Sequence, residues 1–152
     1  MSAAEFPELS ELLPHSGPMR LLARVLSHDV ERTVCALDPA ASELFRDAEG
    51  RVPGWLALEW MAQCIAAHGG LVARAAGRQP SPGMLVGAKR VGLERWAFAA
   101  GETLEVEARF TASAGALASF ACALRAGAEI VATGSLSVYV ADSAARAPGV
   151  AP

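Results

Sequence analysis

The sequence is poor in charge and holds no basic cluster. Charged residues make up 19% of the 152 residues, hydrophobic residues make up 53%, and the formal net charge is -3. Disordered chains show the opposite balance, so this composition indicates a folded globular protein. Without clustered Lys and Arg, nucleic acid is not an expected partner. The length corresponds to one domain.

Cysteine is also scarce, and no metal-ligand motif is present. Cys35, Cys64 and Cys122 lie far apart among apolar neighbours, with no CxxC pair and no His/Cys cluster. We therefore expect free buried thiols in a reducing compartment, no bound metal and no cofactor. The N-terminus lacks the features of a signal peptide, and charged and polar residues interrupt the most apolar stretch, residues 55–76. These features predict a cytoplasmic protein without a membrane span.

Two kinds of hydrophobic pattern alternate along the chain. Helical spacing predicts a short helix over residues 6–13 and a long helix from Pro53-Gly54 to about residue 76. The Ala/Pro/Gly-rich tail, 142–152, is expected to be flexible. Strand patterns with a tight turn at Ala126-Gly127-Ala128 predict about six strands, over residues 19–27, 33–37, 84–91, 103–112, 117–125 and 129–140.

The long helix is apolar over most of its circumference but carries one stripe of polar and small residues. At 100° per residue this stripe spans roughly 80°, and its members are Glu59, Gln63, Ala66, Gly70 and Arg74. Burial raises the pKa of a carboxyl group towards the range of a general acid. Alternatively, Glu59 pairs with an arginine and the small residues form a helix–helix or dimer seam. His68 lies on another side, and we expect it to be a core or interface histidine.

Pro53-Gly54 at the start of this helix is a second feature of interest. Unpaired N–H groups of Gly54 and Trp55 would point outward along the helix axis. Such groups can hold a carbonyl oxygen on which negative charge develops when a neighbouring proton leaves. An ordinary helix start accounts for the same residues.

Several motifs, in order, resemble bacterial β-hydroxyacyl-acyl-carrier-protein dehydratases. Pro53-Gly-Trp-Leu-Ala-Leu-Glu-Trp-Met-Ala-Gln63 is similar to the helix of that family, and Leu13-Pro-His-Ser-Gly-Pro-Met19 to its N-terminal motif. The segments 87–96, 100–106 and 120–122 are similar to later strands and a turn, so the resemblance runs over roughly residues 9–140. Together with Gly83-Met-Leu-Val-Gly-Ala88, these motifs most resemble the subgroup associated with aryl polyene biosynthesis.

The resemblance implies an α+β hotdog fold, with a long central helix wrapped by a curved antiparallel sheet, as one domain over residues 1–141. It implies a homodimer, or a heterodimer with a second dehydratase subunit, with the active site at the interface. The implied reaction converts a 3-hydroxyacyl thioester, bound to acyl carrier protein or coenzyme A, into a trans-2-enoyl thioester in fatty-acid or polyene-type synthesis. Glu59 is the expected acid or water-orienting group and His15 the candidate base. Gly54, Trp55 and Gln63 form the expected substrate-binding set.

One segment departs from the family pattern. The standard dehydratases carry a catalytic histidine in a His-Phe-Pro-Gly-type segment just before the helix, whereas residues 43–53 contain none. Two other functions therefore stay open. One alternative to the dehydratase is a non-catalytic subunit that stabilises a complete dehydratase or holds an acyl chain. The other is a hotdog thioesterase in which Glu59 activates water.

Overall fold

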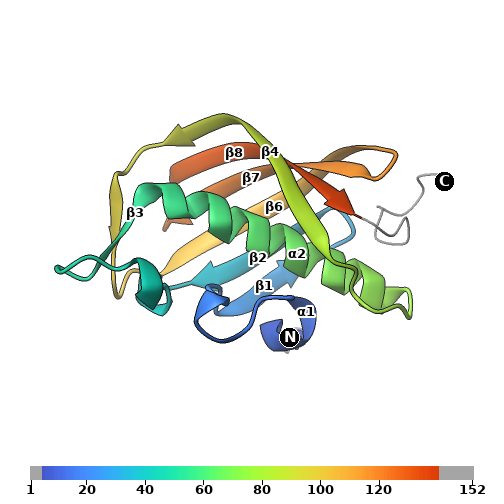
Figure 1. Cartoon of the computed structure of the whole chain (residues 1–152), viewed down its shortest axis with the longest axis horizontal. Coiled ribbons are helices and arrows are strands. Elements are labelled where there is room, and N and C mark those ends of the chain that lie inside the picture. Colours follow the sequence, from blue (N-terminus) through green and yellow to red (C-terminus); the bar gives the residue numbers. More distant parts are fainter. Residues whose placement is uncertain (1–4, 141–152) are drawn as a thin grey trace.

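A long helix, α2 (Ala57–Ala75), forms the centre of the protein, and an antiparallel sheet curves around it (Figure 1). The computed structural model describes residues 5–140. A 3-10 turn, Gly54–Leu56, leads into α2. The helix buries Trp60, Met61 and Cys64 completely, because its apolar residues face the sheet on several sides.

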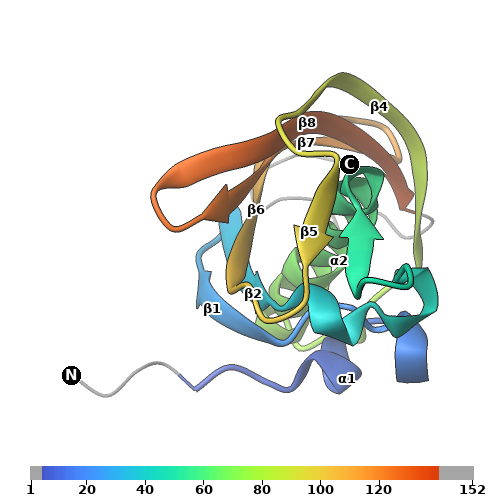
Figure 2. The same cartoon turned by 90° about the vertical axis from the view of Figure 1, so that its left-hand side faces the viewer.

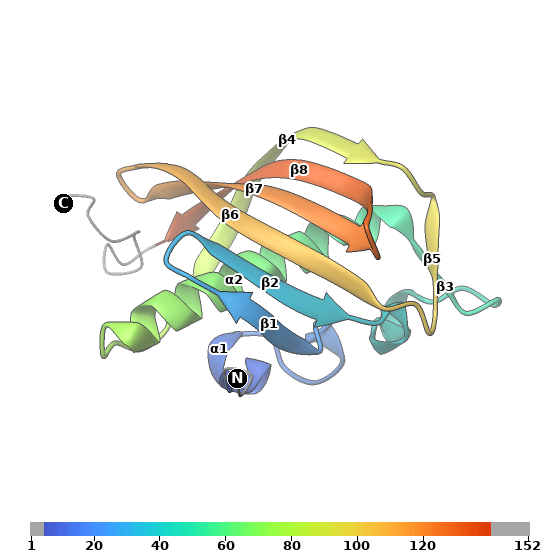
Figure 3. The same cartoon turned by 180° about the vertical axis from the view of Figure 1, so that it is seen from behind.

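The main sheet has six strands in the order β1-β2-β6-β7-β8-β4, and every neighbouring pair is antiparallel. Seen along α2, it curls from β1 beside the helix, over β7 and β8, to β4 on the far side (Figure 2). Figure 3 shows the outer side of the same sheet. The strands are β1 (Arg24–His28), β2 (Arg32–Leu37), β4 (Gly83–Leu93), β6 (Leu104–Ala114), β7 (Leu117–Ala126) and β8 (Glu129–Val140).

This arrangement confirms the predicted hotdog architecture, with differences in its smaller parts. The short helix is only one turn, α1 (Leu9–Leu12), and the first strand begins at Arg24 rather than at residue 19. Residues 17–19 form a 3-10 turn, and the side chain of Gln63 binds the carbonyl oxygen of Met19 and the N–H of Leu21. The turn between β7 and β8 is as predicted, with Gly127 at φ 61°. The predicted flexible tail, 142–152, lies outside the described residues.

A second, two-stranded sheet was not predicted. It pairs β3 (Arg51–Pro53) with β5 (Ala97–Ala99), and these strands lie side by side near the start of α2 (Figure 2). Each strand has only three residues, too few to show an alternating pattern. The sheet nevertheless fixes the position of Pro53 and hence the direction in which α2 begins.

Small residues on α2 form a seam with α1. A Cβ added at Gly70 would lie 3.0 Å from the carbonyl oxygen of Leu12, so the two helices touch through backbone at this point. The sequence left open a helix–helix seam or a dimer seam, and at Gly70 the structure shows the helix–helix seam. Arg74 continues the stripe to the surface, where it pairs with Glu11 at 3.8 Å.

The cysteines and the long helix agree with the sequence analysis. Cys35, Cys64 and Cys122 are buried and unpaired. By length and composition alone, the helical stretch Gly54–Ala75 is apolar enough to cross a membrane, but most of it is buried inside this fold as a core helix.

Candidate functional site

The structure brings His15 and Glu59 together, although 43 residues separate them in the sequence. Glu59 lies in the first turn of α2, and His15 lies in the loop between α1 and the 3-10 turn Gly17–Met19. The distance from His15 Nε2 to Glu59 Oε1 is 3.3 Å, and about a third of each side chain is exposed, 27% and 33%. Glu59 pairs with this histidine, so the alternative of an arginine partner is wrong.

The other ring nitrogen of His15, Nδ1, makes no hydrogen bond within the described residues. This atom is also buried. Glu59 is therefore the group that orients the imidazole. The two side chains have the residue types of an acid–base pair, in which the carboxyl group holds the imidazole in place.

Gln63 lies one turn further along α2 and orients Glu59. Its side chain is fully buried, its Nε2 donates to Glu59 Oε1 at 3.0 Å and to the carbonyl oxygen of Met19 at 2.8 Å, and its Oε1 accepts from the N–H of Leu21 at 3.0 Å. Both amide protons of Gln63 therefore take part in hydrogen bonds within the protein. The expectation that Gln63 binds substrate directly does not fit this geometry, because the amide ties Glu59 to the loop that follows His15.

Gly54 does not offer the unpaired N–H that the sequence suggested. Its N–H donates to the carbonyl oxygen of Trp96 at 2.7 Å. A Cβ at this position would lie 2.2 Å from the carbonyl oxygen of Arg95, so glycine is required for the close backbone approach. Gly54 is accordingly a structural residue in this chain, and the expectation that it binds substrate through this N–H is wrong.

Trp55 lies outside the cavity that His15 and Glu59 share. Its side chain is 56% exposed and meets the ring of Phe45 edge-on at 6.1 Å. Its role as a substrate-binding residue stays a prediction.

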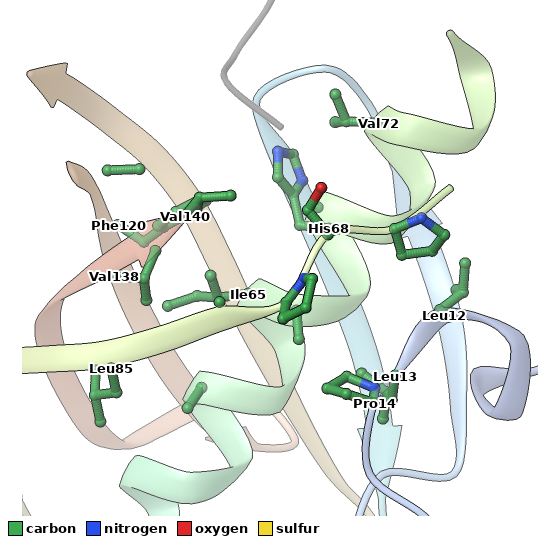
Figure 4. Close-up of a pocket in the computed structure, with 18 of the residues that line it drawn as sticks. Leu12, Leu13, Pro14, Ile65, His68, Val72, Leu85, Phe120, Val138 and Val140 are labelled. Carbon is green, nitrogen blue, oxygen red and sulfur yellow. The ribbon is translucent and has the colours of Figure 1, made fainter. Parts of the chain in front are cut away.

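His15 and Glu59 line an apolar cavity of about 400 Å³ that also borders α2. Figure 4 shows the part of this cavity around Ile65, His68 and Val72. This volume lies within the range of small-molecule sites. Its walls come from α1 and the loop after it, α2, residues 80–82, and strands β4, β6, β7 and β8. The apolar lining residues include Leu12, Leu13, Pro14, Ala62, Ile65, Ala66, Val72, Leu85, Phe110, Ala118, Phe120, Val138 and Val140.

His68 lies in the wall of the same cavity. The side chain is almost fully buried, as predicted, and its Nδ1 lies 2.8 Å from Thr33 Oγ1, which lies 2.7 Å from Nδ1 of His28. Burial, followed by the nearby His28, lowers the pKa of His68 to about 4, so the ring is neutral at physiological pH. Sequence reasoning placed His68 in the core or at an interface and missed its contact with the cavity.

Comparison with known proteins agrees with the hotdog fold. A family model described as ApeP-like, ApeP dehydratase, matches residues 7–148. The dehydratase heterocomplex ApeI:P from Xenorhabdus doucetiae contains a chain with 26% identity and a TM-score of 0.86, over 91% of this chain and 94% of that one. No curated protein matches.

More distant structures share the fold alone. An uncharacterised protein from Pyrococcus horikoshii has 16% identity and a TM-score of 0.61, over 81% of this chain and 85% of that chain. A hypothetical thioesterase with coenzyme A from Streptococcus pneumoniae has 12% identity and a TM-score of 0.57, over 77% of this chain and 84% of that chain.

Proposed function

Because the chain belongs to the ApeP-like dehydratase family, we propose that it is a dehydratase subunit that converts 3-hydroxyacyl thioesters into trans-2-enoyl thioesters. The substrate is carried by acyl carrier protein or coenzyme A in the cytoplasm. One observation carries the proposal: His15 and Glu59 form an acid–base pair at the wall of an apolar cavity. Such a cavity accommodates an acyl chain while its polar residues face the reacting carbons.

The pair can carry out both proton transfers of the reaction. His15 takes the proton from the carbon next to the thioester carbonyl. The electron pair of the broken C–H bond then forms the new carbon–carbon double bond. The hydroxyl group on the next carbon leaves as water with a proton from Glu59. The proton now on His15 then returns to Glu59 across the 3.3 Å separation, which restores the starting state.

The sheet edge at β4 supports a second dehydratase subunit as the partner. β4 is an eleven-residue strand that ends the sheet and pairs only with β8 in the described part of the chain. Its apolar side chains are exposed, among them Met84 at 65% and Val86 at 52%, and Trp96 beyond it is 94% exposed. An exposed apolar edge strand is a site at which another chain can pair and bury the apolar side chains. The similar chain from Xenorhabdus doucetiae belongs to a heterocomplex, so we assign this edge to the partner subunit.

Light scattering tests the assembly. The chain should form a dimer, with itself or with a second dehydratase, and Val86→Glu should weaken that dimer. Val30→Glu is the matched control, because Val30 is similarly exposed, at 58%, but lies in the turn between β1 and β2. A monodisperse monomer at micromolar concentration, with the second dehydratase also present, would contradict the assignment.

Glu59→Gln tests the chemistry. The substitution keeps the shape and removes the titratable proton, so turnover should fall by about 10²–10⁴-fold with folding intact. His15→Ala should have a similar effect, and the double variant should lose little more than either single one because the two residues act as a unit. Glu11→Gln is the control, since Glu11 also lines the cavity but pairs with Arg74. Full dehydration by Glu59→Gln would refute the site.

A non-catalytic subunit is the second candidate, and two observations favour it. No histidine occurs in residues 43–53, and the N–H of Gly54 is already hydrogen-bonded. In that case dehydration would occur only with the partner present and would not respond to Glu59→Gln or His15→Ala.

A further inference from the structure

We infer that the β4 edge selects a partner strand with acidic side chains at its middle, and that it thereby disfavours a second copy of this chain. This inference deepens the proposed function, because it takes β4 to be the edge on which the partner subunit docks. The strand order places β4 at one end of the main sheet and β1 at the other, as Figure 3 shows.

The middle of β4 is basic, whereas its two ends are apolar. Lys89 and Arg90 are the charged residues of this strand, and both are exposed. Met84 and Val86 lie exposed before them, and Val91 lies exposed after them. The apolar ends favour burial against another chain. The same burial would remove the two positive charges from water, which is costly unless the other chain supplies carboxylates.

A β-bulge coincides with the two basic residues. Lys89 lies opposite Ser135 of β8. Gly92, three positions later, lies opposite Thr133, so β4 holds one residue more than β8 in this interval. Within the bulge Arg90 has φ 53°, a left-handed conformation that is strained for a residue other than glycine. Bulges and charged side chains both hinder the pairing of an edge strand with an identical strand.

A second copy of the chain supplies the wrong charge. If two β4 strands paired antiparallel over most of their length, the basic residues of each would lie near those of the other, because positions 89 and 90 are close to the middle of the strand. Like charges in an interface repel each other and raise its cost.

Glu94 of a copy does not remedy this. To lie opposite Lys89 or Arg90, Glu94 requires a register in which Met84 and Val86 face residues beyond the end of the copied strand. The apolar side chains would then lose their cover. A different strand, with Asp or Glu at its middle, satisfies the charges and the apolar ends in one register.

Charge reversal turns this chain into a partner of the required kind. The wild type is mixed with a ¹⁵N-labelled Lys89→Glu/Arg90→Glu variant at low salt, and native mass spectrometry compares the dimers. The mixed dimer should have a Kd about tenfold or more below that of either chain with itself. About 0.5 M NaCl should reduce this preference, because salt screens the attraction.

Arg24→Glu/Arg46→Glu is the matched control. It makes the same change of charge at two exposed positions outside β4, one on the opposite edge strand and one in the loop before β3. Mixed with the wild type, it should show no preference for the mixed dimer. A statistical mixture with the β4 variant, monomers alone, or an equal preference with the control would overturn the proposal.

A cross-link supplies a second measurement, because Lys89 is the single lysine of the sequence. A carbodiimide condenses the Lys89 amine with an adjacent carboxyl group to an amide and takes up the released water as a urea. With the second dehydratase subunit, mass spectrometry should find Lys89 joined to an Asp or Glu of that subunit. Lys89→Arg keeps the charge but removes the amine and should abolish the product. No such cross-link in the wild type would overturn the proposal.

Turnover separates the two levels of inference. Selective pairing without dehydration contradicts the proposed chemistry alone and supports the role of β4. Dehydration by a dimer that does not respond to charge reversal at Lys89 and Arg90 contradicts this inference alone.

Discussion

Replacing Gln63 with methionine should destabilise the protein and disturb the active site together. Methionine fills the space of the glutamine side chain but makes none of its three hydrogen bonds. Leu21 is fully buried, so its N–H would be left unpaired, at a cost of about 1–3 kcal/mol. The other two partners, Met19 and Glu59, can reach water, and each lost bond costs about 1 kcal/mol or less. The expected loss of unfolding free energy is therefore about 1–5 kcal/mol.

Urea unfolding at fixed protein concentration measures this loss, with Gln79→Met as the control because Gln79 is exposed. Gln63→Glu gives a second check. It places a carboxylate where an amide nitrogen now lies 3.0 Å from Glu59 Oε1, so its destabilisation should shrink as the pH falls and the carboxylates are protonated. A change within about 0.5 kcal/mol of zero for Gln63→Met would refute the positioning role.

Three further predictions concern the fold around the site. Gly54→Ala should cost about 1–3 kcal/mol or more by thermal unfolding, because the new Cβ would lie 2.2 Å from the Arg95 carbonyl oxygen, whereas Gly69→Ala, with open space at its Cβ, should be neutral or stabilising. Since the pKa of His68 is lowered to about 4 from 6.5, stability should be complete above pH 6.5 and fall by about 3 kcal/mol towards pH 4, and His68→Phe should flatten this slope. Thiol titration should count three thiols after denaturation and almost none before, because burial raises the pKa of Cys122 to about 12 and that of Cys64 well above its usual value.

The sequence was sufficient for the long elements of the fold. The helix that ends at Ala75 and strands β6, β7 and β8 have ten residues or more, so their hydrophobic period is unambiguous. The pairing of β3 with β5 could not be predicted from the sequence. It joins Arg51 to Ala99, and each strand has only three residues. Such contacts depend on tertiary packing rather than on local pattern.

The site was predictable only in part. Family resemblance pointed to His15 and Glu59, and the structure adds that the two side chains meet. The roles of Gln63 and His68 were not predictable, since one depends on where the loop at Leu21 lies and the other on which strands close the cavity. No spacing within α2 carries that information.

Product analysis tests the central claim most directly. The purified protein, alone and mixed with a second dehydratase, is incubated with a 3-hydroxyacyl thioester, and mass spectrometry follows the acyl group. The account predicts loss of one water to give the trans-2-enoyl thioester, at a rate that falls with Glu59→Gln in this chain. Release of free thiol, or dehydration by the mixture at a rate unaffected by Glu59→Gln, would contradict it.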